Sequence, residues 1–116
     1  MTDDNGPHDP PLIADLKEDA GLYDRLTWAR EVLNLGESET KNSIDNQCNR
    51  LLKKWHPDLI NNRNEACKTY TRQIITAKKI IDDYCDNYKY SFTFQETKKY
   101  LSPQEWHWLH FGEESV

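Results

Sequence analysis

The chain has 116 residues, of which 36 % are hydrophobic and 30 % are charged, and its formal net charge is −5. This composition predicts one domain with a small core and polar margins, and it argues against a large enzyme cleft. No apolar run approaches the roughly 18 residues that a membrane-spanning helix needs, and residues 1–11 are acidic and proline-rich, unlike a signal peptide. We therefore expect an intracellular, cytoplasmic protein with no membrane contact.

The charge is distributed unevenly along the chain. Residues 1–25 carry −5, residues 26–81 carry +4, and residues 82–116 carry −4. A basic middle between acidic ends suits an acidic protein partner better than a nucleic acid, because the ends would repel phosphate. We expect no nucleic-acid partner and a monomeric protein.

The N-terminal fifth of the chain is expected to be a flexible acidic segment over residues 1–20, because its prolines resist helix formation. A short turn at residues 12–16 could dock on the body. The first helix is predicted over residues 23–35, with Gly36 in the left-handed position just past its end. Its apolar positions recur at helical spacing at Leu22, Leu26, Ala29 and Leu33.

Two longer helices follow, joined by a short loop. Thr40 is a good N-cap for a helix over residues 40–55, which Pro57 then ends. Its apolar stripe is formed by Ile44, Cys48, Leu51, Leu52 and Trp55. After a loop at residues 59–63, a third helix is predicted over residues 64–87. Its stripe is formed by Cys67, Tyr70, Ile74, Ala77, Ile81 and Tyr84.

The three cysteines are Cys48, Cys67 and Cys85, and they form no CxxC motif. Each falls on or near the apolar stripe of a predicted helix. We interpret them as buried free thiols in a reducing compartment rather than as disulfides or metal ligands.

The C-terminal segment, residues 89–116, is rich in aromatic residues. Ser102, Pro103 and Glu105 have the pattern of an N-cap, a first helical proline and an acidic first turn, which predicts a helix over residues 103–110. Gly112 is expected to stop this helix, and a shorter one could cover residues 94–100. We expect residues 89–112 to pack on the third helix, because so many exposed aromatic side chains would promote aggregation.

The most informative motif is the tripeptide His56-Pro57-Asp58, at the turn between the two longer helices. A basic cluster in the last turns of the preceding helix stands beside it, at Arg50, Lys53 and Lys54. One interpretation is that these cations only stabilise the C-terminus of the helix dipole. The other is that they steer an acidic partner towards the tripeptide.

Residues 26–81 resemble a J domain, the module of DnaJ-type co-chaperones. The resemblance rests on Val32-Leu33-Asn34-Leu35-Gly36, on Thr40 followed by Ile44, Leu51 and Lys54-Trp55-His56-Pro57-Asp58, and on Glu65-Ala66 with Ile74, Ala77 and Ile81. On this basis we expect a J domain over residues 21–88. The segment Tyr84-Cys85-Asp86-Asn87-Tyr88-Lys89-Tyr90-Ser91-Phe92 is similar to small bacterial J proteins that have an aromatic tail and lack substrate-binding domains.

The resemblance implies an all-α fold in which a short first helix and an antiparallel helical hairpin precede a C-terminal helical extension. It also implies a co-chaperone that docks on a DnaK-type chaperone and stimulates its ATP hydrolysis. The residues implied in docking are His56, Pro57, Asp58, Arg50, Lys53 and Lys54. No cofactor is implied. The chain differs from the family pattern at Asp45, Cys48, Asn49 and Lys78, and it lacks a basic fourth-helix motif. It therefore has fewer basic residues for docking than the family pattern implies.

Other functions have weaker support in the sequence. His107 and His110 could share one helical face, but no third metal ligand accompanies them. His56 and Asp58 could form an acid–base pair, but no nucleophile pattern or glycine-rich phosphate loop stands with them, so we do not expect an enzyme. The alternative function is a J-like interaction module that holds a client or an assembly through its aromatic tail without stimulating an ATPase.

Overall fold

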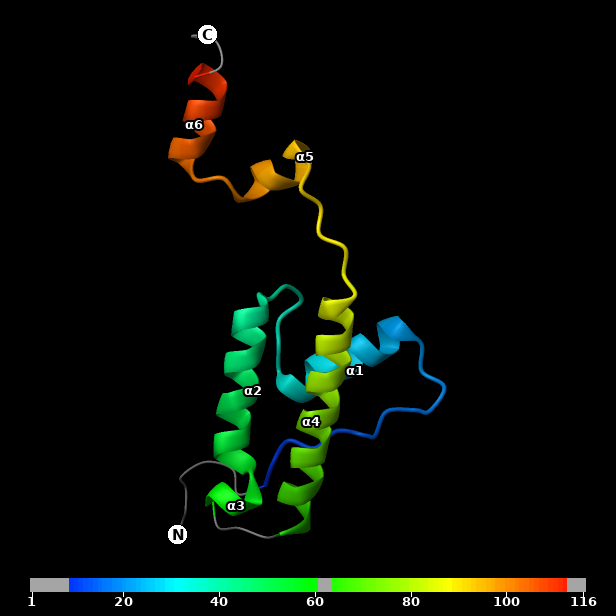
Figure 1. Cartoon of the computed structure of the whole chain (residues 1–116). Helices are drawn as coiled ribbons and strands as arrows, with labels where there is room; N and C mark the ends of the chain where they lie inside the picture. Colours follow the sequence, from blue (N-terminus) through cyan, green and yellow to red (C-terminus); the bar gives the residue numbers. More distant parts are fainter. Residues whose placement is uncertain (1–8, 61–63, 113–116) are drawn as a thin grey trace.

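The computed structural model describes residues 9–60 and 64–112, and all regular secondary structure in these ranges is helical. The elements in chain order are α1 (Leu22–Leu33), α2 (Lys41–Trp55), α3 (Pro57–Ile60), α4 (Glu65–Asp86), α5 (Phe94–Thr97), the 3₁₀ helix η1 (Lys98–Tyr100) and α6 (Pro103–Gly112). Helices α2 and α4 lie antiparallel, α1 crosses α4, and the C-terminal helices stand beyond one end of this body (Figure 1). The predicted all-α fold is confirmed.

A polar side chain caps the N-terminus of each helix in the hairpin of α2 and α4. The Thr40 hydroxyl accepts a hydrogen bond from the Ser43 N–H at 3.1 Å, as its predicted N-cap role requires. The Asn64 side-chain oxygen accepts one from the Cys67 N–H at 2.8 Å and starts α4 in the same way. The buried apolar side chains come from α1, α2 and α4: Ala29, Val32, Leu33, Ile44, Cys48, Trp55, Cys67, Tyr70, Ile74, Ala77, Ile80 and Ile81.

Helix α1 ends earlier than predicted because Asn34, not Gly36, takes the left-handed conformation. Asn34 has φ 53° and ψ 49°, and the N–H of Leu35 donates back to the Arg30 carbonyl at 2.9 Å. Asparagine tolerates this conformation better than most residues with a side chain. The Gly36 N–H instead donates to the Glu39 carboxylate at 2.9 Å, in the loop that leads to α2.

Side chains of α2 and α4 donate hydrogen bonds to the last carbonyl groups of α1. A helix leaves its last four carbonyls without intrahelical donors, here those of residues 30–33. The first two accept backbone N–H groups of the residues that follow the helix. The Val32 carbonyl accepts the Tyr70 hydroxyl at 2.8 Å, and the Leu33 carbonyl accepts the Gln47 side-chain amide at 2.9 Å. Helix α1 is thereby tied to both α2 and α4 through polar contacts.

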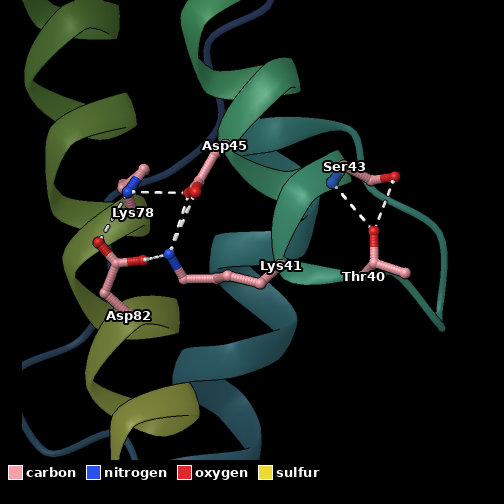
Figure 2. Close-up of polar contacts among 6 residues, drawn as sticks. All are labelled: Thr40, Lys41, Ser43, Asp45, Lys78 and Asp82. Carbon is pink, nitrogen blue, oxygen red and sulfur yellow. Dashed lines mark hydrogen bonds and ion pairs between the residues drawn. The ribbon is translucent and has the colours of Figure 1, made fainter.

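A ring of ion pairs joins α2 to α4 near the start of α2 (Figure 2). Lys41 Nζ lies 3.0 Å from Asp45 Oδ1 and 3.1 Å from Asp82 Oδ1, the second at ion-pair distance without hydrogen-bond alignment. Lys78 Nζ lies 3.2 Å from Asp45 Oδ1 and 2.7 Å from Asp82 Oδ2. We call Lys41, Asp45, Lys78 and Asp82 the ion-pair ring. Each cation contacts both anions, so the ring connects the helices regardless of which single pair is strongest.

The ring shifts the pKa values of its members in the direction that favours charge. The contacts with Asp45 and Asp82 raise the pKa of Lys41, and the hydrogen bond to Asp82 raises that of Lys78. The hydrogen bonds from Lys41 and the contact with Lys78 lower the pKa of Asp45. Desolvation works to raise the pKa of Asp82, but its contacts with Lys78 and Lys41 outweigh that effect and lower it.

Part of the N-terminal segment differs from the flexible lead-in expected over residues 1–20. Residues 10–16, which we call the N-terminal strap, lie against the helical body, and the side chains of Ile13 and Leu16 pack on its core. Trp28 Nε1 donates to the Ala14 carbonyl at 2.8 Å. Gln73 Nε2 donates to the Ile13 carbonyl at 2.8 Å, so α1 and α4 both hold the strap. Residues 1–8 of the expected segment lie outside the described residues.

The C-terminal segment also differs from expectation, because it does not pack on α4 in the structure. Residues 87–93 lead away from the end of α4, and α5, η1 and α6 stand apart from the body (Figure 1). Phe92 is 89 % exposed and Trp108 is 72 % exposed. The radius of gyration is 20.3 Å, whereas a compact chain of this length has about 13 Å. The Phe111 side chain, expected in the packing, lies outside the described residues.

Local contacts rather than packing define the helices of this tail, as we call residues 89–112. The Thr93 hydroxyl accepts from the Glu96 N–H at 3.3 Å and caps α5. Ser102 and Glu105 form a reciprocal capping box at the start of α6, with bonds of 3.0 and 3.1 Å between side chain and backbone. The helix predicted from Pro103 is confirmed, and it extends to Gly112. Within the part of the tail whose side chains the structure describes, the aromatic side chains remain exposed.

All three cysteines are free thiols. Cys48 and Cys67 are buried, and Cys85 is partly buried. Burial raises the pKa of the Cys48 thiol and that of the Cys85 thiol, so both carry less of the reactive thiolate. Within the ranges that the structure describes, no helix is both long and apolar enough to cross a membrane.

Candidate functional site

Pro57 creates the turn that holds the tripeptide. A residue that precedes proline avoids helical angles, and His56 accordingly has φ −66° and ψ 124°. The His56 N–H still donates to the Leu52 carbonyl at 2.8 Å, as the last helical bond of α2. Pro57 then occupies the first position of α3, where its missing N–H costs nothing. The loop expected from residue 59 is therefore replaced, through Ile60, by one short helical turn.

The His56 ring is held by the backbone of the same turn. Its Nδ1 accepts a hydrogen bond from the Asp58 N–H at 3.2 Å, and the Leu59 N–H donates to the His56 carbonyl at 3.0 Å. In a neutral imidazole one nitrogen accepts and the other donates, so Nε2 carries the proton in this arrangement. The tripeptide, which we call the trigger tripeptide, thus combines a histidine donor with the nearby carboxylate of Asp58.

Burial differs among the three members of the trigger tripeptide. Pro57 is buried, His56 is partly buried and Asp58 is exposed. The buried proline anchors the turn to the body, while the carboxylate of Asp58 stays within reach of a partner. Asp58 also lies in the first turn of α3, where an acidic side chain is favoured.

Trp55 fixes the end of α2 on which the trigger tripeptide stands. Its side chain is only 4 % exposed, and its ring meets that of Tyr70 on α4 edge-on, with centroids 6.2 Å apart. Such an aromatic pair adds about 0.5–1.5 kcal/mol to the effect of burial. Lys54 Nζ lies 5.4 Å from the centroid of the Trp55 ring, within the range of a cation–π contact.

The three basic residues predicted for the site lie together on the solvent side of α2. Arg50, Lys53 and Lys54 are all exposed, and their spacing places them on one helical face. We call these residues the basic face. The Arg50 guanidinium also contacts the side-chain oxygen of Gln47, which itself reaches back to α1. The structure therefore brings all six predicted residues to one end of the α2–α4 hairpin, while the tail leaves from the other (Figure 1).

Sequence reasoning proposed these site residues but missed two contacts that join the helices of the hairpin. Asp45 and Lys78 were each noted only as departures from the J-domain pattern, whereas the structure pairs them across α2 and α4. Their opposite charges, each beside an apolar stripe, were the signal that could have predicted this pair. The spacing of apolar residues placed Tyr70 on the buried side of its helix, but it could not predict the contacts of Tyr70 with Trp55 and Val32. Spacing does not specify the partner of a hydroxyl group.

The sequence also raised a possible metal site at His107 and His110. Among the described residues, no group of three or more His, Cys, Asp and Glu side chains could hold a metal ion. His107 lies on α6, and the side chain of His110 lies outside the described residues.

Comparison with known proteins gives no match: no protein-family model, no curated protein and no solved structure matches the chain.

Proposed function

We propose that this protein is a J-type co-chaperone that docks on a DnaK-type chaperone and stimulates its ATP hydrolysis. One observation carries the proposal: His-Pro-Asp occupies the reversal of an antiparallel helical hairpin, with its proline buried and its aspartate exposed. A tripeptide alone is common in proteins. Its position after Lys53-Lys54-Trp55, at the end of α2, is much more specific.

The geometry of the turn suits docking with little loss of conformational freedom. Pro57 fixes the backbone, and the bond from the Asp58 N–H to His56 Nδ1 orders the histidine ring before any partner arrives. Groups that are already ordered lose less entropy on binding. In the proposed complex, the Asp58 carboxylate accepts hydrogen bonds from an arginine of the chaperone, and His56 Nε2 supplies a neighbouring donor.

The basic face supplies the charge for encounter with an acidic surface. Between Asp45 and Asp58, α2 and the turn contain no acidic residue, and Arg50, Lys53 and Lys54 are exposed there. Exposed charges at the rim of an interface act mainly on the association rate and on its salt dependence. Three cations form a modest positive surface, which fits a transient encounter rather than a tight complex.

The trigger is tested by single-turnover ATP hydrolysis with a purified bacterial DnaK-type chaperone. We expect the wild-type chain to accelerate hydrolysis, and we expect His56→Gln and Asp58→Asn each to remove most of that acceleration. Asp83→Asn is the matched control, since Asp83 is an exposed residue of α4 that pairs only locally with Lys79. Circular dichroism is measured on the same samples to show that every variant stays helical.

The proposal is wrong if the wild-type chain gives no acceleration with several DnaK-type chaperones. It is equally wrong if Asp83→Asn loses as much acceleration as Asp58→Asn at the same helicity. In the second case the trigger tripeptide would have no role of its own.

A second candidate function is favoured by the exposure of the tail. Tyr90, Phe92 and Trp108 lie in solvent at the far end of the hairpin from the trigger tripeptide. A tethering module would use this end and would not need Asp58. Removing the tail then abolishes capture of the tethered protein, while Asp58→Asn leaves that capture unchanged.

A further inference from the structure

Residues 88–94 have the sequence pattern of a strand that has no partner in the structure. Tyr88, Tyr90, Phe92 and Phe94 alternate with Lys89, Ser91 and Thr93. Strict alternation of apolar and polar side chains over seven residues is typical of a strand with one buried face. Tyrosine, phenylalanine and threonine also favour extended backbone. We call residues 88–94 the aromatic strand.

The structure leaves residues 89–92 of the aromatic strand available to pair, whereas Thr93 and Phe94 begin α5. Within the described ranges, the backbone groups of residues 89–92 form no backbone hydrogen bond. The side chains of Tyr90 and Phe92 are 67 % and 89 % exposed. The rings of Tyr88 and Tyr90 lie 5.7 Å apart, so alternate side chains already share one side of the chain. An extended segment with free N–H and C=O groups on both edges is a template for another strand.

We propose that the aromatic strand pairs with the same strand of a second copy, antiparallel and centred on Ser91. In this register Tyr90 faces Phe92 of the second copy, and Lys89 faces Thr93. Pairing of Tyr88 with Phe94 also requires Phe94, the first residue of α5, to leave the helix. Every aromatic side chain meets another aromatic side chain across the pair, and such cross-strand pairs stabilise a sheet. No charge meets a like charge.

The charge of Lys89 selects this register over a parallel one. In a parallel pair without offset, Lys89 would face Lys89 of the second copy, which is unfavourable. The antiparallel arrangement also has the two-fold symmetry expected of a dimer between identical chains. It places the two helical bodies at opposite ends of the paired strands. Both trigger tripeptides stay accessible, so the pairing does not depend on the proposed chaperone function.

The dimer is expected to be weak. A two-stranded ribbon alone is only marginally stable in water, so association should become visible only at high protein concentration. This is consistent with a monomer in dilute solution, as expected from the sequence. The aromatic face of the ribbon remains open on one side, which leaves room for further contacts from the same tails.

Cysteine cross-linking of the full chain tests both the pairing and its register. The variants are made in a Cys85→Ser background, since Cys85 is the one native thiol that is not buried. Ser91→Cys places two thiols opposite each other, with Cα atoms about 4.5–5.5 Å apart, as a disulfide requires. Lys89→Cys is the matched control, because antiparallel pairing separates its two copies by about 14 Å.

We expect Ser91→Cys to form covalent dimers at least about tenfold faster than Lys89→Cys under mild oxidation. Adding Tyr90→Ser and Phe92→Ser should reduce the Ser91→Cys rate to the level of the control. Sedimentation of the wild-type chain should show association that the Tyr90→Ser, Phe92→Ser variant lacks. The helices of the tail stand apart from the body (Figure 1), so circular dichroism should show that all variants keep their helices.

Three results would overturn the inference. Equal cross-linking of Ser91→Cys and Lys89→Cys would mean a parallel pair or random collision. A wild-type chain that stays monomeric at every concentration, without cross-linking, would mean that the strand does not self-associate. Association that survives Tyr90→Ser with Phe92→Ser would place the contact elsewhere. Each result can be read whether or not the chain stimulates an ATPase.

Discussion

At the scale of single residues, the candidate site depends on buried side chains that fix the position of its backbone. Pro57 stops α2 and starts α3, and Trp55 holds the preceding turn against Tyr70. Tyr70 also donates its hydroxyl to the Val32 carbonyl at the end of α1. One side chain of α4 therefore contacts the element that carries the trigger tripeptide and satisfies the end of the first helix.

Replacing Tyr70 with phenylalanine isolates the hydrogen bond from the packing. The ring stays against Trp55, but the buried Val32 carbonyl loses its donor, which should cost about 1–3 kcal/mol of unfolding free energy. Urea unfolding followed by circular dichroism measures the loss. Tyr100→Phe is the control, because Tyr100 is 79 % exposed on η1 and should change stability by less than about 0.5 kcal/mol. Equal stability of both variants would show that the Tyr70 hydroxyl contributes nothing.

At the scale of elements, α2 and α4 are joined in different ways at their two ends. Near the trigger tripeptide the contact is aromatic, between Trp55 and Tyr70. Near the start of α2 it is ionic, through the ion-pair ring (Figure 2). Surface ion pairs are individually weak, but a closed ring of four side chains keeps each charge paired when one contact opens. The ring thus sets the register of the two helices at the end that lacks the aromatic contact.

The ion-pair ring predicts how stability changes with pH. The pKa values of Asp45 and Asp82 lie below their ordinary value of 3.8 in the folded chain, so their contribution is complete above that value and is lost as the pH falls through the folded values. The pKa values of Lys41 and Lys78 are raised above 10.5, so their contribution is lost only as the pH rises beyond that value. Between about pH 5 and pH 9 the ring should contribute a constant amount.

Asp82→Asn tests this prediction by urea unfolding at several pH values. At pH 7 the variant should be less stable than wild type by about 0.5–1 kcal/mol, because Lys78 loses its closest partner. That difference should shrink as the pH falls below about 3.8, where the wild-type carboxylates also become protonated. Asp83→Asn, on the neighbouring exposed position, should show little difference at any pH. A difference for Asp82→Asn that does not change with pH would contradict an ionic origin.

At the scale of the whole molecule, the two ends of the chain relate differently to the body. The N-terminal strap is held by Trp28 and Gln73, and its apolar side chains reach the core. The tail has its own helix caps and stands away from the body, which explains the large radius of gyration. The folded unit therefore extends from the strap to the end of α4, and the tail is an appended element.

Deleting each end separately tests this division. Removal of residues 1–16 should lower the melting temperature by several degrees, because Ile13 and Leu16 leave the core and Gln73 loses its acceptors. Truncation after Asn87 should change the melting temperature little, since no described side chain beyond Asn87 belongs to the core or packs on it. Differential scanning calorimetry measures both. A large loss of stability on truncation after Asn87, with Trp106 and Trp108 shielded from a soluble quencher in the full chain, would instead show a tail packed on the body.

The sequence by itself determined the features that depend on neighbouring residues. Apolar spacing predicted the three long helices, Thr40 and Ser102 predicted two of the helix starts, and Pro57 predicted the break at the trigger tripeptide. These features arise from hydrogen bonds and steric effects within a few positions, so a local reading suffices. The choice of Gly36 as the left-handed residue was the local exception, because Asn34 can adopt the same angles two positions earlier.

Only the tertiary structure decided which distant side chains meet. Asp45 and Lys78 are 33 positions apart, Gln73 reaches Ile13 across 60 positions, and Tyr70 reaches Val32 across 38. Such contacts depend on how the helices are rotated and offset against one another, which local spacing does not specify. The same holds for the tail. Its aromatic composition predicted burial, but burial needs a complementary surface within reach, and the path of residues 87–93 leads away from the body.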